Sequence, residues 1–206
     1  MNVIKTLKHK GYTIKVVQDE EPQSPREFDN LGKMVCFHKR YTLPNETSHK
    51  STDYSGWNGL QNLIHDESPE VILPVYMYDH SGLTINTTGF SCPWDSGQIG
   101  FIFASKQDVT KEFGEVTSEV VTKVKKVLEA EVKEYSDFLE GNVYGFVVES
   151  ADGNQIDSCW GFIGDPEKSG LLEQAKDAVD SELRVIGEQT DLFGEQMNLF
   201  PEVKLG

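Results

Sequence analysis

Carboxylate and imidazole side chains gather in three polar stretches of the sequence, residues 24–38, 78–82 and 92–101. Side chains of these two kinds hold divalent metal ions or carry out acid–base catalysis in proteins. If the stretches meet in the folded chain, they predict a metal-dependent hydrolase. The candidate side chains are Asp29, His38, Asp79, His80 and Asp95.

Ordinary turn chemistry explains the same side chains, and we favour that interpretation. The spacing of the candidates is irregular, and no two histidines stand four residues apart as they do in zinc hydrolases. The sequence also lacks a phosphate-binding glycine loop and the Gly-x-Ser-x-Gly elbow of hydrolases. In "DHSG" an Asp opens and a Gly closes a typical β-turn. We therefore expect these side chains to bond mostly to nearby backbone. We expect no cofactor, and we favour a protein without enzyme activity over an enzyme.

The C-terminal sequence "GEQTDLFGEQMNLF" (187–200) repeats one seven-residue phrase. Each copy ends on Leu-Phe and carries a Gln three residues before the Leu. The copies resemble the pentapeptide Gln-Leu-(Ser/Asp)-Leu-Phe, by which bacterial proteins dock on the sliding clamp of the DNA polymerase. The residues that the resemblance places at the partner are Gln189, Leu192, Phe193, Gln196, Met197, Leu199 and Phe200.

The resemblance implies a role for each of these side chains. The Leu-Phe pair would fill an apolar pocket on the clamp, where burial stabilises each residue by roughly 1.5–3 kcal/mol. The Gln amide would bond to polar groups beside that pocket and add about 1 kcal/mol. The clamp box of eukaryotes and archaea needs an aromatic pair further on, which neither copy has. The implied partner is therefore the sliding clamp of a bacterial host.

A second interpretation makes the same segment part of the protein's own fold. The seven-residue period places the two Leu-Phe pairs on one helical face, which could pack on a sheet. We favour docking because a Gln in each copy has no role in a simple core stripe. Gly187, Gly194 and Pro201 predict that no continuous helix crosses the copies and that the tail is loosely packed.

The chain of 206 residues carries a net charge of −15. Nucleic acid binding relies on Lys and Arg, so direct contact with DNA or with an anionic membrane is disfavoured. The charge serves solubility or, in an alternative function, marks an acidic anti-defence inhibitor of the anti-restriction or anti-CRISPR type. The absence of a secretion signal and of any run of about 18 apolar residues predicts a cytoplasmic protein. Three widely separated cysteines predict free thiols.

Hydrophobic patterns predict an α+β fold, in which helices pack on a largely antiparallel sheet. The main strands are expected at residues 12–17, 33–43, 70–79 and 98–105, with a hairpin around Asp152-Gly153. Helices are expected at residues 57–66, after Ser105, over 116–140 and from Pro166 to about Arg184. We expect one domain over residues 1–186 and a tail over residues 187–206.

Three segments are also similar to a family of proteins encoded by phages, plasmids and some prokaryotic genomes. They are a Ser-Pro-Arg-Glu-aromatic-Asp-Asn-Leu-Gly segment, a Tyr-Asp-His-Ser-Gly turn and a Trp-Asp-Ser-Gly-Gln segment, here beginning at Ser24, Tyr78 and Trp94. The resemblance covers residues 12–163 and implies a mobile-element origin without a particular chemistry. We therefore expect a phage- or mobile-element-encoded protein whose tail docks on the host clamp. Docking would either recruit the domain to replicating DNA or block other clients of the clamp.

Overall fold

The chain forms two compact units in a computed structural model that describes residues 1–44, 52 and 55–198, with the backbone alone at residue 63 and over 190–198. The first unit consists of Met1–Pro22 with Val143–Gly206, and the second consists of Gln23–Asn142. We expected a single domain over residues 1–186, whereas the second unit is inserted between two strands of the first. The pairing that closes the first unit joins segments more than a hundred residues apart, so no local pattern predicts it.

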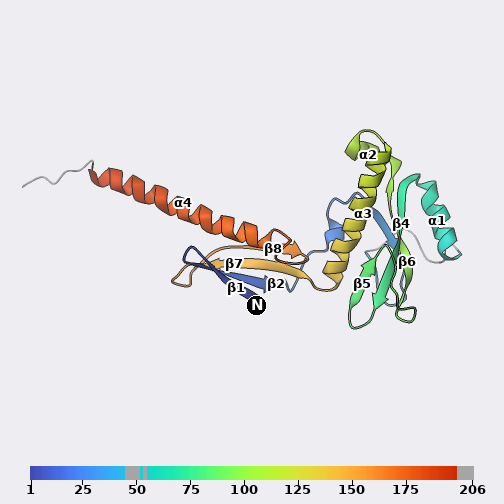
Figure 1. Ribbon diagram of the computed structural model, residues 1–206, viewed down its shortest axis with the longest axis horizontal. Coiled ribbons are helices and arrows are strands. Elements are labelled where there is room, and N and C mark those ends of the chain that lie inside the picture. Colours follow the sequence, from blue (N-terminus) through green and yellow to red (C-terminus); the bar gives the residue numbers. More distant parts are fainter. Residues whose placement is uncertain (45–51, 53–54, 199–206) are drawn as a thin grey trace, which may run out of the picture. The chain divides into compact units, whose positions relative to one another are not determined.

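The α+β class is confirmed, with two antiparallel sheets and helices packed on them (Figure 1). The elements of the first unit are β1 (Val3–His9), β2 (Tyr12–Gln18), β7 (Val143–Glu149), β8 (Gln155–Ile163) and α4 (Leu171–Asn198). Those of the second are η1 (Pro25–Glu27), β3 (Lys33–Cys36), α1 (Gly56–Asp66), β4 (Pro69–Asp79), β5 (Leu83–Asn86), β6 (Ser96–Ser105), α2 (Lys106–Phe113) and α3 (Ser118–Leu139).

The sheet of the first unit has the strand order β1-β2-β7-β8. The expected hairpin at Asp152-Gly153 joins β7 to β8, and Gly153 adopts a φ of +83° there. Gln18 at the end of β2 pairs with Tyr144 at the start of β7, which is where the second unit is inserted. The polar edge strand β1 was not expected from the sequence, because Lys5, Lys8 and His9 leave no regular alternation of apolar and polar residues.

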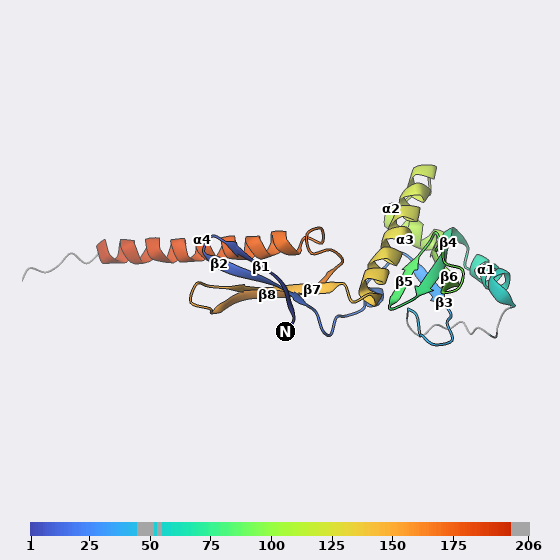
Figure 2. The same ribbon diagram turned by 60° about the horizontal axis from the view of Figure 1, so that its bottom comes forward.

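α4 packs its first half on this sheet. Leu171, Ala175 and Val179 are fully buried against a strand face that includes Ile14 and Phe146. In two views the far end of α4 extends beyond the strands of its own unit (Figures 1 and 2). Among the side chains of α4 that the structure describes, the buried stripe ends at Val179, and those from Leu183 to Gln189 are exposed.

The continuity of α4 corrects one expectation. Its backbone is helical through Gly187 and Gly194 to Asn198, although we expected the helix to end near Arg184 and the glycines to interrupt the tail. A helical glycine costs only about 1 kcal/mol relative to alanine. Extending an existing helix also adds a hydrogen bond per residue without a new nucleation step. Isolated glycines therefore do not end a helix that packing has already started. Pro201 lies outside the described residues.

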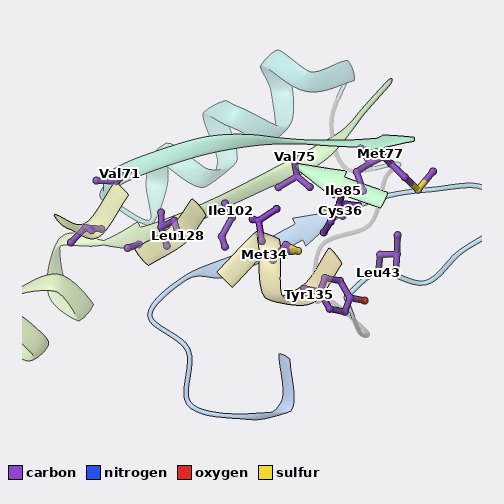
Figure 3. Close-up of a cluster of buried hydrophobic side chains, with 14 of the residues drawn as sticks. Met34, Cys36, Leu43, Val71, Val75, Met77, Ile85, Ile102, Leu128 and Tyr135 are labelled. Atoms are coloured by element: carbon purple, nitrogen blue, oxygen red, sulfur yellow. The ribbon is translucent and has the colours of Figure 1, made fainter. Parts of the chain in front are cut away.

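The sheet of the second unit, in the order β3-β6-β4-β5, is the middle of three layers. α3 covers one face and α1 the other (Figures 1 and 2). The expected stripe of α3 is confirmed, since Val124, Leu128, Val132 and Tyr135 are buried. Figure 3 shows Leu128 and Tyr135 among strand side chains of this core. On the opposite face Leu60, Ile64, Phe101 and Phe103 form a smaller cluster.

All three cysteines are free thiols, as expected. Cys36 is buried in the α3-side core, and the loss of hydration raises the pKa of its thiol to about 12. Among the described residues, no helix is long and apolar enough to cross a bilayer.

Candidate functional site

Two of the three polar stretches, 78–82 and 92–101, and the last residue of the stretch 24–38 meet at one end of the sheet in the second unit. The antiparallel register places Tyr78 in β4 opposite Ser96 in β6, and the Asp79 amide donates to the Asp95 carbonyl at 2.9 Å. β3 lies on the other side of β6, so His38, which follows β3, reaches the same end. The convergence on which the hydrolase alternative depends is found in part, because strand pairing brings His38, Asp79 and Asp95 to one end of the sheet.

These side chains and their neighbours line a hollow of about 290 Å³, which we call the Trp94 hollow. Trp94 stands at its rim with 90% of its surface exposed. Most isolated apolar side chains on a surface need no explanation, but an indole this exposed beside a polar hollow is typical of binding sites. Trp94 and several polar side chains line it, among them His38, Arg40, Asp79, Asp95 and Gln98.

Side chains from different segments connect around the hollow. Arg40 donates to Asp79, which also accepts a hydrogen bond from the Tyr41 hydroxyl at 3.4 Å. The Arg40 guanidinium lies over the Tyr41 ring at 5.5 Å from its centroid, within the range of a cation–π contact. The His38 ring stacks on the same Tyr41, with the centroids 5.0 Å apart.

A second set of contacts joins the two turns. His80 Nδ1 lies 3.5 Å from an oxygen of Asp95, and the Cys92 thiol lies 3.8 Å from the same oxygen. The His80 ring also stacks on Tyr78 at 5.9 Å. We expected these side chains to bond mostly to nearby backbone, and this holds for His38, whose Nδ1 accepts from the Arg40 amide at 3.3 Å.

For the two carboxylates the expectation of backbone bonding is wrong. The Asp79 side chain pairs with Arg40 and Tyr41, and the Asp95 side chain pairs with His80 and Cys92. The reason is that three strand ends converge here and bring side chains of distant segments within reach. Local turn bonding is not the main use of these groups.

The beginning of the stretch 24–38 has a separate, structural role. Asp29 lines another hollow, of about 400 Å³, together with Lys33 and Lys111. The Ser24 hydroxyl accepts a hydrogen bond from the Arg26 amide and so caps η1. The Arg26 guanidinium then pairs with Glu131 of α3 at 2.9 Å. The Ser-Pro-Arg-Glu segment therefore anchors the loop before β3 to α3, and Asp29 does not join the Trp94 hollow.

The geometry offers no ligand set for the metal-dependent hydrolase. In the part of the chain that the structure describes, no group of three or more His, Cys, Asp or Glu side chains is placed to hold a metal ion. The Arg40 guanidinium on Asp79 is one physical reason, since a cation in that position repels a metal.

Arg40 and Trp94 of the hollow, and Tyr41 beside it, are not among the candidates that the sequence indicates. Arg40 and Tyr41 follow β3, in a segment that we expected to be a continuous strand to residue 43, whereas β3 ends at Cys36. Trp94 belongs to a stretch that we selected for its aspartate. An indole within a turn of Pro, Asp, Ser and Gly is the signal that could have identified it, because turns of these residues lie at the surface and would expose the ring.

The second candidate site is the C-terminal part of α4. Leu183, Val185 and Ile186 are exposed, as is Gln189 of the first copy. From residue 190 to 198 the backbone alone is described, which includes Leu192, Phe193, Gln196 and Met197. Leu199 and Phe200 lie outside the described residues.

Comparison with known proteins adds no relative. No family model, no curated protein and no solved structure matches the chain. The class that the observations define is an α+β protein with an inserted second unit, a polar hollow in that unit and a long C-terminal helix on the first.

Proposed function

We propose that the protein is a binding module that docks on the sliding clamp of a bacterial host through the two Gln-x-x-Leu-Phe copies at residues 189–193 and 196–200. The similarity of both copies to the clamp-docking pentapeptide is the first support. The resemblance of the polar segments to a family of phage and plasmid proteins agrees with a bacterial host. Such a protein acts in the bacterial cytoplasm, where the clamp is found.

The observation that carries the proposal is the change in burial along α4. Its inner stripe is fully buried up to Val179, whereas Leu183, Val185 and Ile186 are between 37% and 49% exposed. The first copy begins at Gln189, which is exposed, and in both views the far end of α4 extends beyond the strands of its own unit. The alternative in which the segment folds back on the sheet thus receives no support as far as residue 189.

A helical tail is compatible with a partner that binds extended peptides. Beyond the packed part, each residue of a helix is stabilised by no more than about 0.3 kcal/mol, because propagation constants are close to one. Gly187 and Gly194 reduce that stability further. Unwinding one five-residue copy therefore costs much less than the roughly 3–6 kcal/mol from burying its Leu and Phe. With the loss of chain entropy included, one copy should bind at about micromolar strength.

The net charge of −15 explains why such a protein would need a protein partner to reach DNA. A chain this acidic is repelled by DNA, whereas a clamp ring encircles DNA and offers protein pockets. Docking would place the two folded units beside replicating DNA or would exclude other clients from the pockets. The second use also agrees with the alternative function of an acidic anti-defence inhibitor.

Calorimetry of the full chain against a purified bacterial clamp tests the proposal. Replacing Leu192, Phe193, Leu199 and Phe200 by Ala should abolish micromolar binding, because all of the apolar anchors are lost. The matched control is a Val185→Ala, Ile186→Ala variant, which removes apolar surface from the same helix outside the copies and should bind normally. Unchanged affinity in the quadruple variant, or equal losses in both variants, would contradict specific docking.

The duplication itself has a measurable consequence. Seven residues span at most about 24 Å even when fully extended, which is too short to link identical pockets around a ring that encloses duplex DNA. The second copy therefore adds a statistical factor of about two instead of true bivalency. Replacing Leu192 and Phe193 alone should weaken binding about twofold. A hundredfold loss would show that only the first copy binds.

A further inference from the structure

The Trp94 hollow lies in the inserted unit, whereas the two copies belong to the C-terminal segment of the other unit. The side chains of the hollow form a connected arrangement that is exposed to solvent. The hydrogen bonds already present determine which atoms remain available to a ligand.

The hollow offers donors and acceptors in similar number. His38 Nδ1 accepts from the Arg40 amide, so neutral His38 carries its proton on Nε2 and can donate. The Gln98 amide nitrogen donates to the Gly100 carbonyl at 3.2 Å, which leaves the Gln98 side-chain oxygen as an acceptor. Arg40 uses one terminal nitrogen on Asp79 and has further N–H groups to donate. Asp95 adds acceptor oxygens.

One Arg and two Asp line the hollow, so its formal charge is −1 when His38 is neutral. Asp79 neutralises Arg40 by direct contact, and Asp95 is the remaining carboxylate, with His80 3.5 Å away. An anionic ligand such as a phosphate would meet Asp95 and an already paired guanidinium. A cationic ligand would meet Arg40. A neutral ligand with many groups that both donate and accept suits this lining best.

Trp94 supplies the apolar part of the arrangement. Its indole is 90% exposed at the rim, so a ligand can cover the ring face without displacing protein. Saccharide rings combine an apolar C–H face, which packs on an aromatic ring, with hydroxyl groups around the edge. A hollow of about 290 Å³ is at the small end of ligand sites, which are commonly about 300–1,000 Å³. That size corresponds to one sugar ring.

The geometry points to a binding site for a neutral saccharide, in which one sugar ring packs on the Trp94 indole while Arg40, Asp95 and Gln98 bond to its hydroxyls. His38 Nε2 is a further donor toward the same space. The site is open and small, so a single ring should bind with a dissociation constant of about 1 mM.

Saturation-transfer NMR on the full chain tests this assignment. The probes are methyl glycosides of glucose, galactose and mannose, the disaccharide maltose, and glucose 6-phosphate as an anionic comparison. We expect transfer to the ring protons of at least one neutral glycoside. The phosphate should bind no more tightly than its neutral parent. Preference for glucose 6-phosphate, or transfer to none of the probes at tenfold excess over the expected dissociation constant, would overturn the proposal.

Two variants locate the binding. Trp94→Ala removes a side chain that is already exposed, so it should fold normally and lose saccharide binding at least tenfold. Trp160→Phe is the matched control, because Trp160 is also exposed but lies on β8 in the first unit. Gln98→Glu keeps the size of its side chain while it adds charge, and it should weaken binding severalfold. Binding that survives Trp94→Ala, or that the Trp160→Phe control loses equally, would contradict the assigned site.

Discussion

Arg26 and Glu131 form a nearly buried ion pair, with 2.9 Å between Nη1 and Oε2 and with side chains only 6% and 11% exposed. Glu131 also accepts hydrogen bonds from the backbone amides of Leu31 and Gly32. Arg26 in turn donates to the Asn30 side chain and to the Gly32 carbonyl. The pair thus closes a network in which one carboxylate of α3 organises the loop before β3.

Removal of one partner should destabilise the second unit strongly. Arg26→Ala leaves Glu131 as a poorly hydrated charge without its cation, and such changes cost about 3–5 kcal/mol. Urea denaturation followed by circular dichroism measures the loss. The matched control is Lys125→Ala, which breaks an exposed pair with Glu129 on the same helix and should cost less than about 1 kcal/mol. Equal effects of the two changes would show that the buried pair has no special weight.

The same network requires a glycine at position 32. A Cβ atom there would lie 2.6 Å from Leu128 Cδ2 and 2.7 Å from both Glu131 Oε2 and Ile102 Cδ1. Gly32→Ala should therefore cost about 1–3 kcal/mol of folding stability through overpacking. Gly82→Ala is the control, because a Cβ at Gly82 meets no atom within 4 Å. Thermal unfolding of the two variants should separate them clearly, and similar midpoints would contradict the close contact.

Local signals made most of the elements predictable. The stripe of α3 follows from apolar residues at helical spacing, and its burial is confirmed. The start of α2 follows from Ser105 and Asp108. The Ser105 hydroxyl accepts a hydrogen bond from the Asp108 amide, as an N-cap does, and donates one to the Asp108 carboxylate. The expected strand at 33–43 is too long, because β3 ends at Cys36. Beyond it Tyr41 and Leu43 pack on the α3-side core, whereas His38 and Arg40 line the Trp94 hollow.

Non-local relationships were not predictable from one sequence. The pairing of β2 with β7 closes the first unit around the inserted one, and no sequence pattern near Pro22 or Asn142 indicates an insertion. The meeting of Asp79 and Asp95 was expected as a possibility because both occur in short polar turns. The selection of Arg40 as the partner of Asp79 depends on three strands ending together, which only the sheet register reveals.

Acid should weaken the cap of α2. The Ser105 hydroxyl, 2.6 Å from the Asp108 carboxylate, is the main cause of a lowered pKa of Asp108, and Lys33 at 3.2 Å adds to it. Because the folded pKa is below the unfolded value of about 3.9, ionised Asp108 stabilises the folded state above that pH. This contribution is lost as the pH falls through the folded pKa.

Asp108→Asn should therefore lower the urea midpoint at pH 7, and the difference from the unaltered chain should shrink below about pH 4. Glu112→Gln, on the same helix, makes the same change in net charge and should leave the midpoint nearly unchanged at both pH values. A difference for Asp108→Asn that persists undiminished at pH 2.5 would show that ionisation of this carboxyl is not involved.

Because one unit is inserted into the other, we expect each unit to fold as a separate fragment and to keep its own binding activity. The Asp19 amide donates to the Val143 carbonyl at 2.9 Å, so the points where the chain leaves and re-enters the first unit are adjacent. Joining Pro22 to Val143 by a short Gly-Ser linker should preserve the β1-β2-β7-β8 sheet, since insertions between close ends leave the host fold intact. The excised segment 23–142 has its own cores on both faces of its sheet and should fold alone. Both fragments should unfold cooperatively in circular dichroism.

The joined first unit should bind the bacterial clamp as the full chain does, because it retains α4 and both copies, and it should not bind saccharides. The excised unit should show the opposite behaviour. A folded first unit that loses clamp binding retained by the full chain would mean that the inserted unit contributes to the clamp interface.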